Sequence, residues 1–296
     1  MGKQVRVFIN AKSGNGDAGP EQIVMLFERY GCTCAVTKLK PGLDLAALAK
    51  REPLDVDFIA AGGDGTMNAV ANLLFGSRRR MGVLALGTLN HFAKDLKLPL
   101  ELEEAIAIAA SEQVRAIDAA MVNGVIFVNN SSLGVYPRMV LDRERMKKSG
   151  INKWASLVLA SAKAFARFRC LEIAVEVKGE QRRCVTPFLF VGNNEYCMEG
   201  TSIGERKRLD QGELSLYLAP GATRATMFRL AFAALFGRVK KEPTFEEFKV
   251  KEFTVHVRSR KVRVSLDGEV QRMTGPLNYS IRPRALQILS RAEEIA

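Results

Sequence analysis

The glycine-rich string at residues 62–66 is the feature that most constrains what this chain can fold into. It reads Gly-Gly-Asp-Gly-Thr, and it lies between an apolar stretch at 56–61 and a helical pattern at 67–75. A glycine-rich turn from a buried strand into a helix is typical of an open parallel α/β sheet, which binds ligands at the carboxyl ends of its strands. Glycines let backbone N–H groups approach phosphate oxygens, and a helix N-terminus carries partial positive charge. We therefore predict a phosphate-binding loop here.

Strand and helix patterns alternate over the first 115 residues. Apolar strand patterns cover 5–9, 35–37, 56–61 and 82–86. Helical patterns cover 43–50, 67–75 and 102–110, and one more is opened by Pro20 and closed by Gly31. This alternation, with short connections, predicts a parallel, doubly wound α/β domain. We place its end near residue 116.

Strand patterns dominate from about residue 117. The dipeptide Asn123-Gly124 between two apolar runs is a hairpin signal. Charged and apolar residues alternate, as they do in half-buried strands, at 172–178, 248–257, 262–266 and 277–281. We expect helical inserts near 138–168 and 223–236. The second domain is therefore predicted to be β-rich and antiparallel.

The charge balance indicates the kind of partner. The chain has 44 Lys and Arg against 32 Asp and Glu, a formal net charge of +12. This favours an acidic partner, such as nucleotide phosphates or an anionic membrane. Basic clusters are usually solvated faces, although each basic residue close to an anionic bilayer contributes about 1 kcal/mol. These clusters lie at 78–80, 143–148, 206–208 and 238–241. Nucleic acid is not expected, because the chain shows no aromatic platform or recognisable module.

Cysteine and histidine counts exclude other classes. The 5 cysteines form no CxxC pair and are too sparse for a disulfide framework, which favours reduced thiols in a cytoplasm. The 2 histidines exclude a site with three histidine ligands. We see no signal-peptide pattern and no apolar run near the roughly 18 residues of a membrane span. We expect a cytoplasmic protein that associates with membranes only peripherally.

Other polar strings join the glycine-rich loop as candidates. Asn-Ala-Lys-Ser-Gly at 10–14 and Leu-Gly-Thr-Leu-Asn at 86–90 follow the first and fourth strands, so both are expected at the same sheet edge. A phosphate cradle repels an acidic residue unless a metal ion or a proton transfer employs it, so Asp64 is expected to act with Mg²⁺ or as an acid/base. Thr66 is expected to cap the following helix. Asp-Gly-Glu at 267–269 presents two carboxylates after a strand, but is equally compatible with a plain hairpin turn.

In this order, the strings at 10–14, 62–66, 86–90 and 267–269 resemble the catalytic fold of diacylglycerol and sphingosine kinases. The pattern is most similar to soluble bacterial diacylglycerol kinase-like lipid kinases. The resemblance spans almost the whole chain, including 191–194 and 206–212. It implies an α/β nucleotide-binding domain at 1–116 and an antiparallel β-sandwich at 117–296, whose last ten or so residues pack back on the first domain. It also implies an interdomain cleft where ATP and lipid meet.

The resemblance implies roles for individual residues. Glu269 would accept the proton of the lipid hydroxyl, with Asp267 beside it, and Asp64 would organise Mg²⁺ and phosphates. No side chain is assigned as a ligand of a resident metal. The residues carried over as ATP contacts are Asn10, Ser13, Gly14, Thr37, Gly62, Gly63, Gly65, Thr66, Asn68, Thr88 and Asn90. The implied activity is ATP- and Mg²⁺-dependent phosphorylation of diacylglycerol or a related lipid at an anionic membrane surface, and a homodimer is compatible with it.

The chain departs from the family pattern at several positions. His91 and Lys94 stand where the family often has Asp and Arg, and Ala69 replaces a common glutamate. Gln211 replaces the second Asp of Leu-Asp-Asp-Gly, the family's structural-metal motif. Two alternatives therefore stay open. One is a kinase for a soluble acceptor such as NAD, and the other is a catalytically silent nucleotide or lipid sensor.

Overall fold

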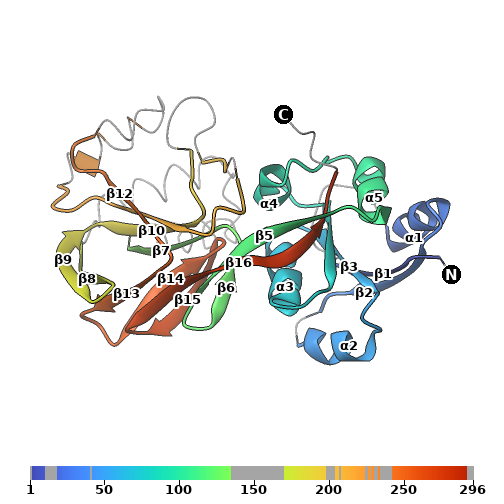
Figure 1. Cartoon of the computed structure of the whole chain (residues 1–296), viewed down its shortest axis with the longest axis horizontal. Coiled ribbons are helices and arrows are strands. Elements are labelled where there is room, and N and C mark those ends of the chain that lie inside the picture. Colours follow the sequence, from blue (N-terminus) through green and yellow to red (C-terminus); the bar gives the residue numbers. More distant parts are fainter. Residues whose placement is uncertain are drawn as a thin grey trace, which may run out of the picture. The chain divides into compact units, whose positions relative to one another are not determined.

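A computed structural model describes most of the chain. The described residues are 2–10, 19–40, 42–134, 170–197, 204–206, 208–223, 226–227, 229, 233 and 242–291. Ser13, Gly14, the helical insert predicted near 138–168 and most of that near 223–236 lie outside them. The chain forms two compact units (Figure 1). Unit 1 comprises residues up to Ala119 together with the segment from Arg282, and unit 2 comprises Ala120–Ile281.

Unit 1 is built on a parallel sheet with the strand order β2-β1-β3-β4-β16. Its first four strands are β1 Gln4–Ile9, β2 Thr33–Lys38, β3 Asp57–Gly62 and β4 Arg80–Ala85. The last part of β16 (Leu277–Leu289) pairs with β4 through Gln287 and Ile288. β3 lies in the middle of the sheet and is buried along its whole length, which explains why its residues after Asp57 are apolar.

Helices cover both faces of this sheet (Figure 1). They are α1 Pro20–Arg29, α2 Leu45–Arg51, α3 Asp64–Leu74, α4 His91–Asp95 and α5 Leu102–Ala110. On the α1 and α5 face, Phe27 and Ile106 join a core with Val7 and Ile59. The short helix α4 was not expected, but the prediction of a doubly wound α/β domain is confirmed.

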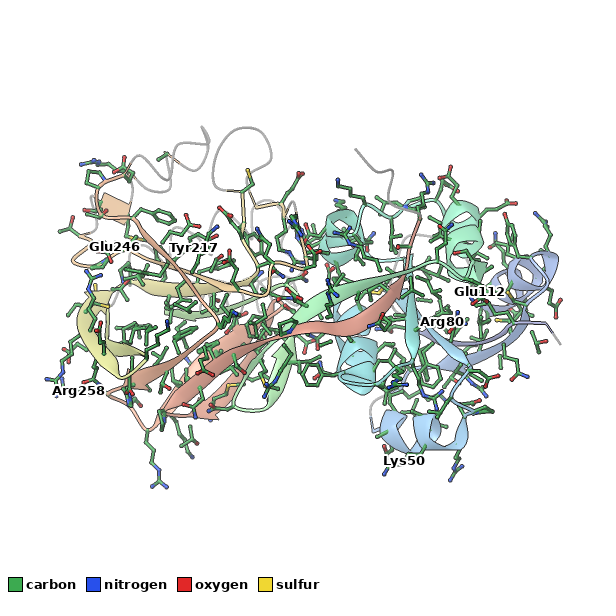
Figure 2. The ribbon with its side chains drawn as sticks, viewed as in Figure 1. Lys50, Arg80, Glu112, Tyr217, Glu246 and Arg258 are labelled. Atoms are coloured by element: carbon green, nitrogen blue, oxygen red, sulfur yellow. The ribbon has the colours of Figure 1, made fainter. Side chains whose placement is uncertain are left out.

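An ionic cluster joins the beginnings of β1, β3 and β4. The buried carboxylate of Asp57 pairs with Lys3 Nζ at 2.9 Å and with Arg80 Nε at 2.6 Å. Arg80 also bonds to Glu112, which lies next to it in Figure 2, and this hydrogen bond lowers the pKa of the Glu112 carboxyl. The cluster occupies the edge opposite to the glycine-rich loops, so it stabilises the sheet rather than serving chemistry.

Arg79, the neighbour of Arg80, is bound inside unit 1. It is only 8% exposed, and its guanidinium donates to the carbonyl oxygens of Ala49 (3.1 Å) and Glu52 (2.7 Å) at the end of α2. The guanidinium also lies over the ring of Phe58, 4.9 Å from its centroid. The interpretation of 78–80 as a solvated basic face is therefore wrong for Arg79 and Arg80, because both side chains bind groups within the fold.

Unit 2 contains two antiparallel sheets. One has the strand order β12-β11-β10-β7-β14-β15. In the other, β13 lies between β8 and the first part of β16, β9 lies at the edge, and β5 pairs with β16 and β6. The bounds are β5 Val114–Val122, β6 Val125–Phe127, β7 Asn130–Gly134, β8 Leu171–Val177, β9 Glu180–Thr186, β10 Phe188–Asn193, β11 Leu214–Leu218, β12 Glu246–Val250, β13 Glu252–Val257, β14 Lys261–Leu266 and β15 Glu269–Thr274.

The two sheets of unit 2 share one hydrophobic core. Val255 and Tyr279 contribute from one sheet, and Leu133 and Val264 from the other. The Tyr279 hydroxyl hydrogen-bonds the Ser131 hydroxyl at 3.0 Å, which ties β16 to β7 across the core. Unit 2 is thus the antiparallel β-sandwich that the resemblance implies. The hairpin predicted at Asn123-Gly124 is also confirmed, since this pair joins β5 to β6.

The prediction of a single strand at 248–257 is wrong. β12 ends at Val250 and pairs with β11, whereas β13 begins at Glu252 and pairs with β8 and β16 in the other sheet. The apolar alternation changes phase between Val250 and Phe253, with Lys251 and Glu252 in between. The chain therefore crosses from one sheet to the other at Lys251.

Candidate active site

Unit 1 brings the ends of its strands together at one edge of the sheet. The Asn10 N–H donates to the Ala61 carbonyl at 3.1 Å, and the Leu86 N–H donates to the Gly62 carbonyl at 3.0 Å. These bonds join the residues that follow β1 and β4 to the last two residues of β3. Thr37, close to the end of β2, lies beside Phe8 of β1 in the sheet. Most of the predicted ATP-contact residues among those described therefore share one edge, as the order of strands requires.

The glycines allow two of these loops to pack backbone against backbone. A Cβ on Gly87 would lie 2.5 Å from the Cα of Gly63, and a Cβ on Gly62 would lie 2.4 Å from Thr66 Oγ1. Such distances exclude a side chain at either position without movement of its neighbours. Gly62 and Gly87 are therefore needed for the packing of the loops themselves, a role that the sequence did not reveal.

The N-terminus of α3 has no side-chain cap. The helix begins at Asp64, and its capping residue Gly63 has an extended backbone and no side chain that could accept a hydrogen bond from the first turn. The prediction that Thr66 caps this helix is wrong, because Thr66 already lies within its first turn. The first N–H groups of a helix lack partners within the helix. The start of α3 can therefore donate to an anion.

Two polar atoms near this N-terminus are buried and lack hydrogen-bond partners in the described part of the chain. They are Thr66 Oγ1 and Asn90 Oδ1. Asn90 has a left-handed backbone (φ 51°), and its Nδ2 donates to the Gly87 carbonyl at 2.9 Å. A buried unpaired polar group costs about 1–3 kcal/mol. Such groups require a physical reason in a native fold, and rearrangement around a bound ligand would supply one.

Asp64 connects α3 to the short helix α4. Its Oδ1 accepts a hydrogen bond from the Phe92 N–H at 3.0 Å, and its Oδ2 accepts one from the His91 N–H at 3.3 Å. The carboxylate thus binds the first turn of α4, which has no side-chain cap from its own Asn90. Asp64 therefore has a structural role that the sequence analysis missed, in addition to the role with Mg²⁺ or protons predicted for it.

The remaining candidates in unit 1 lie close to the same loops. Thr88 is exposed in the loop between β4 and α4. Asn68 is half-buried in α3, and its Oδ1 accepts a hydrogen bond from Asn72 Nδ2 at 2.8 Å. Asn68 thus lies one turn along the helix whose N-terminus faces the loops.

Asp267 and Gly268 form the two-residue turn between β14 and β15. Both have positive φ angles, 47° and 86°, as a type I′ hairpin turn requires. The Asp267 carboxylate accepts three backbone hydrogen bonds, from the N–H groups of Val128 (2.8 Å), Asn129 (2.8 Å) and Asn130 (2.9 Å). This carboxylate therefore attaches the turn to the segment before β7. Asp267 thus has a structural role in addition to the place beside the proton acceptor that the resemblance implies for it.

Glu269 begins β15 opposite Leu266, and it is exposed. Its position two residues after Asp267 means that the anchored turn determines where it lies. Exposure leaves its carboxylate able to meet an acceptor molecule from solution.

A buried arginine also binds the segment at 128–130, so the interpretation of 206–208 as a solvated basic face is wrong for Arg206. Arg206 is 3% exposed, and it donates to the Val128 carbonyl (2.7 Å), the Asn193 carbonyl (3.0 Å) and Asn129 Oδ1 (2.7 Å). Asp267 thus binds the N–H groups of residues 128–130, and Arg206 binds the Val128 carbonyl and the Asn129 side chain. The only sequence signal was the polar Asn193 at the end of an otherwise apolar strand.

The loop at 209–212 does not fit the structural metal site that the resemblance implies. Asp210 pairs with Arg208, with N–O distances of 3.1 and 3.3 Å. Gln211 Oε1 accepts a hydrogen bond from the Glu195 N–H at 3.2 Å, and the Gln211 N–H donates to Asn194 Oδ1 at 2.9 Å. Across the described ranges, no three His, Cys, Asp or Glu side chains are grouped to hold a metal ion. Protein groups therefore hold this loop.

Two models of known protein families match this chain, one over the region of each unit. Residues 4–122 match the model of the diacylglycerol kinase catalytic domain, and residues 140–290 match that of the YegS C-terminal NAD kinase beta sandwich-like domain. These two matches together cover most of the chain, first the α/β unit and then the β-sandwich. The chain belongs to the bacterial diacylglycerol kinase catalytic domain family.

Individual relatives extend over nearly the whole chain. The diacylglycerol kinase of Bacillus subtilis (strain 168) is 27% identical over 274 residues, covering 90% of each chain. That of Staphylococcus saprophyticus is 24% identical, covering 91% of this chain and 90% of its own. The crystal structure of a diacylglycerol kinase from Bacillus anthracis str. Sterne has a TM-score of 0.71 at 18% identity, covering 98% of both chains.

A yeast NADH kinase shares the fold more distantly. Its crystal structure with NADH has a TM-score of 0.57 at 11% identity, and the match covers 99% of this chain and 85% of that one. Within the described ranges, no helix combines the length and apolar character needed to span a membrane.

Proposed function

We propose that this protein is an ATP- and Mg²⁺-dependent kinase that transfers the γ-phosphoryl group to a hydroxyl of diacylglycerol or a related lipid. The observation that carries the proposal is the uncapped N-terminus of α3, which lies where three strand-end loops meet in a member of a lipid kinase family. Phosphoryl transfer depends chiefly on positioning and charge neutralisation, and backbone donors at a helix N-terminus supply both.

Unit 1 supplies the nucleotide-binding groups in this proposal. The N–H groups of Asp64 and Gly65 donate to phosphate oxygens, while Gly87 lets its loop pack against Gly63 of the neighbouring loop. Asn10, Thr37 and Thr88 offer further polar groups at the same edge. Their spread over several strand ends suits an extended ligand that carries several phosphates.

Mg²⁺ enters the proposal together with ATP. Magnesium in kinases is usually held by one or two carboxylates and by substrate phosphates rather than by a protein cage. Asp64, whose carboxylate oxygens each retain a second lone pair, is the carboxylate at the loop edge that fits this role. When bound, the ion supplies positive charge to the phosphates during transfer.

Unit 2 supplies the proton acceptor. Glu269 takes the proton of the lipid hydroxyl, a role that contributes roughly 10²–10⁴-fold in rate. Asp267 keeps the turn in place through its three backbone hydrogen bonds.

The decisive test is a phosphorylation screen. The purified full chain is incubated with Mg²⁺-ATP and a total lipid extract, and products are identified by mass spectrometry, with NAD offered in parallel. We expect a phosphorylated diacylglycerol or a related lipid and no product from NAD. Phosphorylation of NAD alone would overturn the proposal, and nucleotide binding without any turnover would identify a silent sensor.

The alternative hypothesis, a kinase that phosphorylates NAD, has one specific observation in its favour. The fold match to the yeast NADH kinase covers nearly all of this chain. At 11% identity this match shows a shared fold and not a shared acceptor. We therefore place it second and let the parallel assay with NAD decide.

We further propose that the protein works at an anionic membrane surface as a peripheral protein. The net charge of +12 supports this location. Arg79, Arg80 and Arg206 do not contribute to it, because their guanidinium groups bind partners within each unit.

A further inference from the structure

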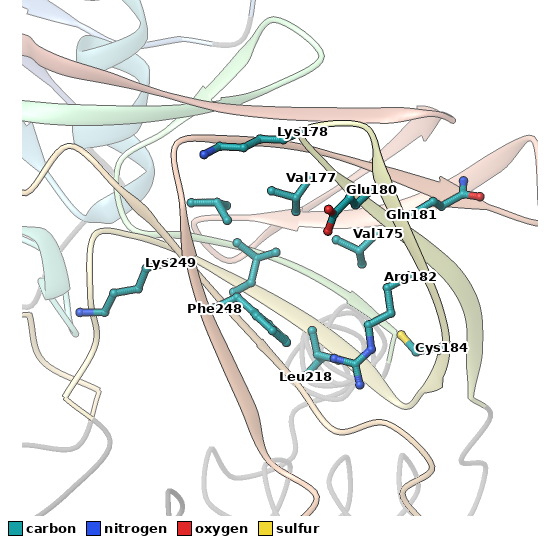
Figure 3. A pocket seen from close by; sticks show the side chains of 12 residues that line it. Val175, Val177, Lys178, Glu180, Gln181, Arg182, Cys184, Leu218, Phe248 and Lys249 are labelled. Carbon is teal, nitrogen blue, oxygen red and sulfur yellow. The ribbon is translucent and has the colours of Figure 1, made fainter.

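One lysine of unit 2 joins two glutamates. The Lys249 ammonium on β12 lies 2.5 Å from a carboxylate oxygen of Glu195 and 3.3 Å from one of Glu213. Glu195 follows β10 in the chain, and Glu213 immediately precedes β11. Figure 3 shows the Lys249 side chain directed away from that of its neighbour Phe248. Val250, the next residue, packs against the hydrophobic core, so Lys249 lies on the opposite face of β12.

The two carboxylates share this one cation. One oxygen of each lies within 3.3 Å of the same nitrogen, so the two negative charges would repel each other if the ammonium were absent. The three side chains are only 28–41% exposed, so water and salt screen them less than fully exposed charges. The hydrogen bond to the Glu195 carboxylate raises the pKa of the Lys249 ammonium, although desolvation opposes this. The ammonium is therefore the charge that keeps these two glutamates together.

Hydrogen bonds link the segment at 193–195 to the turn that precedes Glu269. Asn193 donates two hydrogen bonds of 2.9 Å to carbonyl groups within residues 128–130, one from its N–H and one from Nδ2. The N–H groups of residues 128–130 donate in turn to the Asp267 carboxylate. A displacement of the segment at 193–195 would therefore be transmitted to the turn.

The same segment also holds the loop at 209–212. The Glu195 N–H donates to Gln211 Oε1, and the Gln211 N–H donates to Asn194 Oδ1. The Asn194 N–H donates to the Glu213 carbonyl at 3.1 Å, which joins the segment to the start of β11. The resemblance implies a metal ion for this loop. Instead, β12 supplies an ammonium, which carries one positive charge and three N–H donors.

We propose that Glu195 and Glu213 form a cation site that Lys249 fills from within the chain, and that this internal cation replaces a structural metal ion in unit 2. A lysine ammonium is charged at neutral pH, so the segment at 193–195 stays in place whatever the supply of divalent ions. Lys249 then acts as a positioning residue for Glu269. This last role rests on the proposed function, whereas the cation site itself does not.

The test removes the internal cation and offers a metal ion in its place, without nucleotide. Lys249→Met keeps the length of the side chain and leaves the two carboxylates without their shared cation, and one or two carboxylates with several waters are usual ligands of Mg²⁺. In EDTA, this variant should have a thermal midpoint roughly 2–4 °C below that of the natural chain. Millimolar Mg²⁺ at constant ionic strength should recover most of the loss, whereas the natural chain should have the same midpoint in both. Lys249→Gln replaces Lys249→Met if the latter does not fold.

Two further variants separate a cation site from a general effect of charge. Arg182→Met removes a cation that pairs with the single carboxylate of Glu246, so its midpoint should not respond to Mg²⁺. Lys249→Met combined with Glu195→Gln and Glu213→Gln has no carboxylate pair, so it should be more stable in EDTA than Lys249→Met and should not respond to Mg²⁺. A folded Lys249→Met variant that does not respond to Mg²⁺ would overturn the proposal, as would an equal response of Arg182→Met or of the triple variant.

Kinase assays test the positioning role separately. At saturating Mg²⁺-ATP, the kcat of Lys249→Met should rise severalfold as free Mg²⁺ increases, while its KM for ATP stays constant. Lys249→Arg keeps a cation, so it should behave like the natural chain. A kcat of folded Lys249→Met that does not depend on free Mg²⁺ would contradict the positioning role. If the natural chain phosphorylates no lipid, the proposed function fails, and the thermal midpoints alone still decide whether Lys249 fills a cation site.

Discussion

Asp267 and Asn130 bond to each other in both directions. The Asn130 N–H donates to Asp267 Oδ1 at 2.9 Å, and the Asp267 N–H donates to the Asn130 carbonyl at 2.9 Å. A residue in a hairpin turn is thereby bound to the first residue of β7, 137 positions away in the sequence. Glu269 follows two residues later, so its placement depends on this contact.

Replacing Asp267 with Asn should reduce stability. Asn tolerates the left-handed backbone of a type I′ turn, so the turn itself is preserved. Its Nδ2 group would face an N–H that now donates to the carboxylate, and losing one or two such bonds costs about 1–3 kcal/mol each. Urea unfolding monitored by circular dichroism measures the change.

The matched variant is Glu269→Gln, which should behave in the opposite way. Glu269 is exposed, so stability should change little, whereas turnover should fall by about two to four orders of magnitude while ATP affinity stays the same. Near-natural turnover of Glu269→Gln together with inactive Asp64→Asn would instead make Asp64 the base.

Replacing Asp64 with Asn should lower turnover and shift the Mg²⁺ dependence of the reaction. Asn keeps an acceptor for the Phe92 N–H but removes the charge at the phosphate loop, where a bound metal is the largest local charge. Turnover is measured over a range of Mg²⁺ at fixed ATP. The control is Asp44→Asn, because Asp44 caps α2 through the Ala47 N–H at 3.0 Å without lying in the loops. An unaltered Mg²⁺ profile for Asp64→Asn would contradict its role.

A methyl group at Gly87 should disturb the nucleotide loops far more than one at Gly63. The new Cβ at 87 would lie 2.5 Å from Gly63 Cα, whereas a Cβ at 63 meets Gly87 Cα at 3.5 Å, an ordinary contact. Overpacking of this kind costs about 1–3 kcal/mol. We expect Gly87→Ala to lower both the thermal midpoint and ATP affinity relative to Gly63→Ala. Equal thermal midpoints for the two variants would contradict this prediction, because they would show that the two loops move apart without loss of stability.

Chelating divalent metals should leave the stability of the nucleotide-free protein unchanged. The Gln211 loop is held by hydrogen bonds to Asn194 and Glu195 rather than by clustered carboxylates. Thermal midpoints with EDTA and with Mg²⁺ should therefore coincide. Gln211→Asp, which adds a carboxylate beside Asp210, should become less stable and partly recover with Mg²⁺, whereas Gln271→Asp on exposed β15 should not respond. A lower midpoint of the natural chain in EDTA would reveal a structural metal.

Vesicle binding should be electrostatic. A net charge of +12 predicts tighter binding to anionic than to neutral vesicles, with a steep loss as salt rises. Exposed charges are screened beyond about 8–10 Å at these ionic strengths. Co-sedimentation across a salt series measures this. Equal binding to neutral and anionic vesicles at every salt concentration would contradict the prediction.

Local patterns were sufficient for much of the fold and for one part of the site. β3 is recognisable because a buried parallel strand is mostly apolar, as β3 is after Asp57, and the loop after it because glycines allow a tight strand–helix turn. Strand order then places Asn10 beside the same loop. The division of 248–257 between two sheets also has a sequence signal, because the apolar alternation changes phase at Lys251. Only the pairing shows that this change separates two strands, since β12 pairs with β11 and β13 pairs with β16.

The sequence by itself determined the α/β pattern, the glycine-rich loop and the candidate carboxylates, because these depend on periodicity and on residues adjacent in the chain. Only the tertiary structure decided that the Asp267 carboxylate binds the backbone of residues 128–130, that Asp64 also binds α4, and that Arg79 and Arg206 are buried. Their hydrogen-bond partners lie tens of residues away or more. A charged side chain shows its role only when folding determines which backbone groups surround it, because burial makes every unpaired polar group costly.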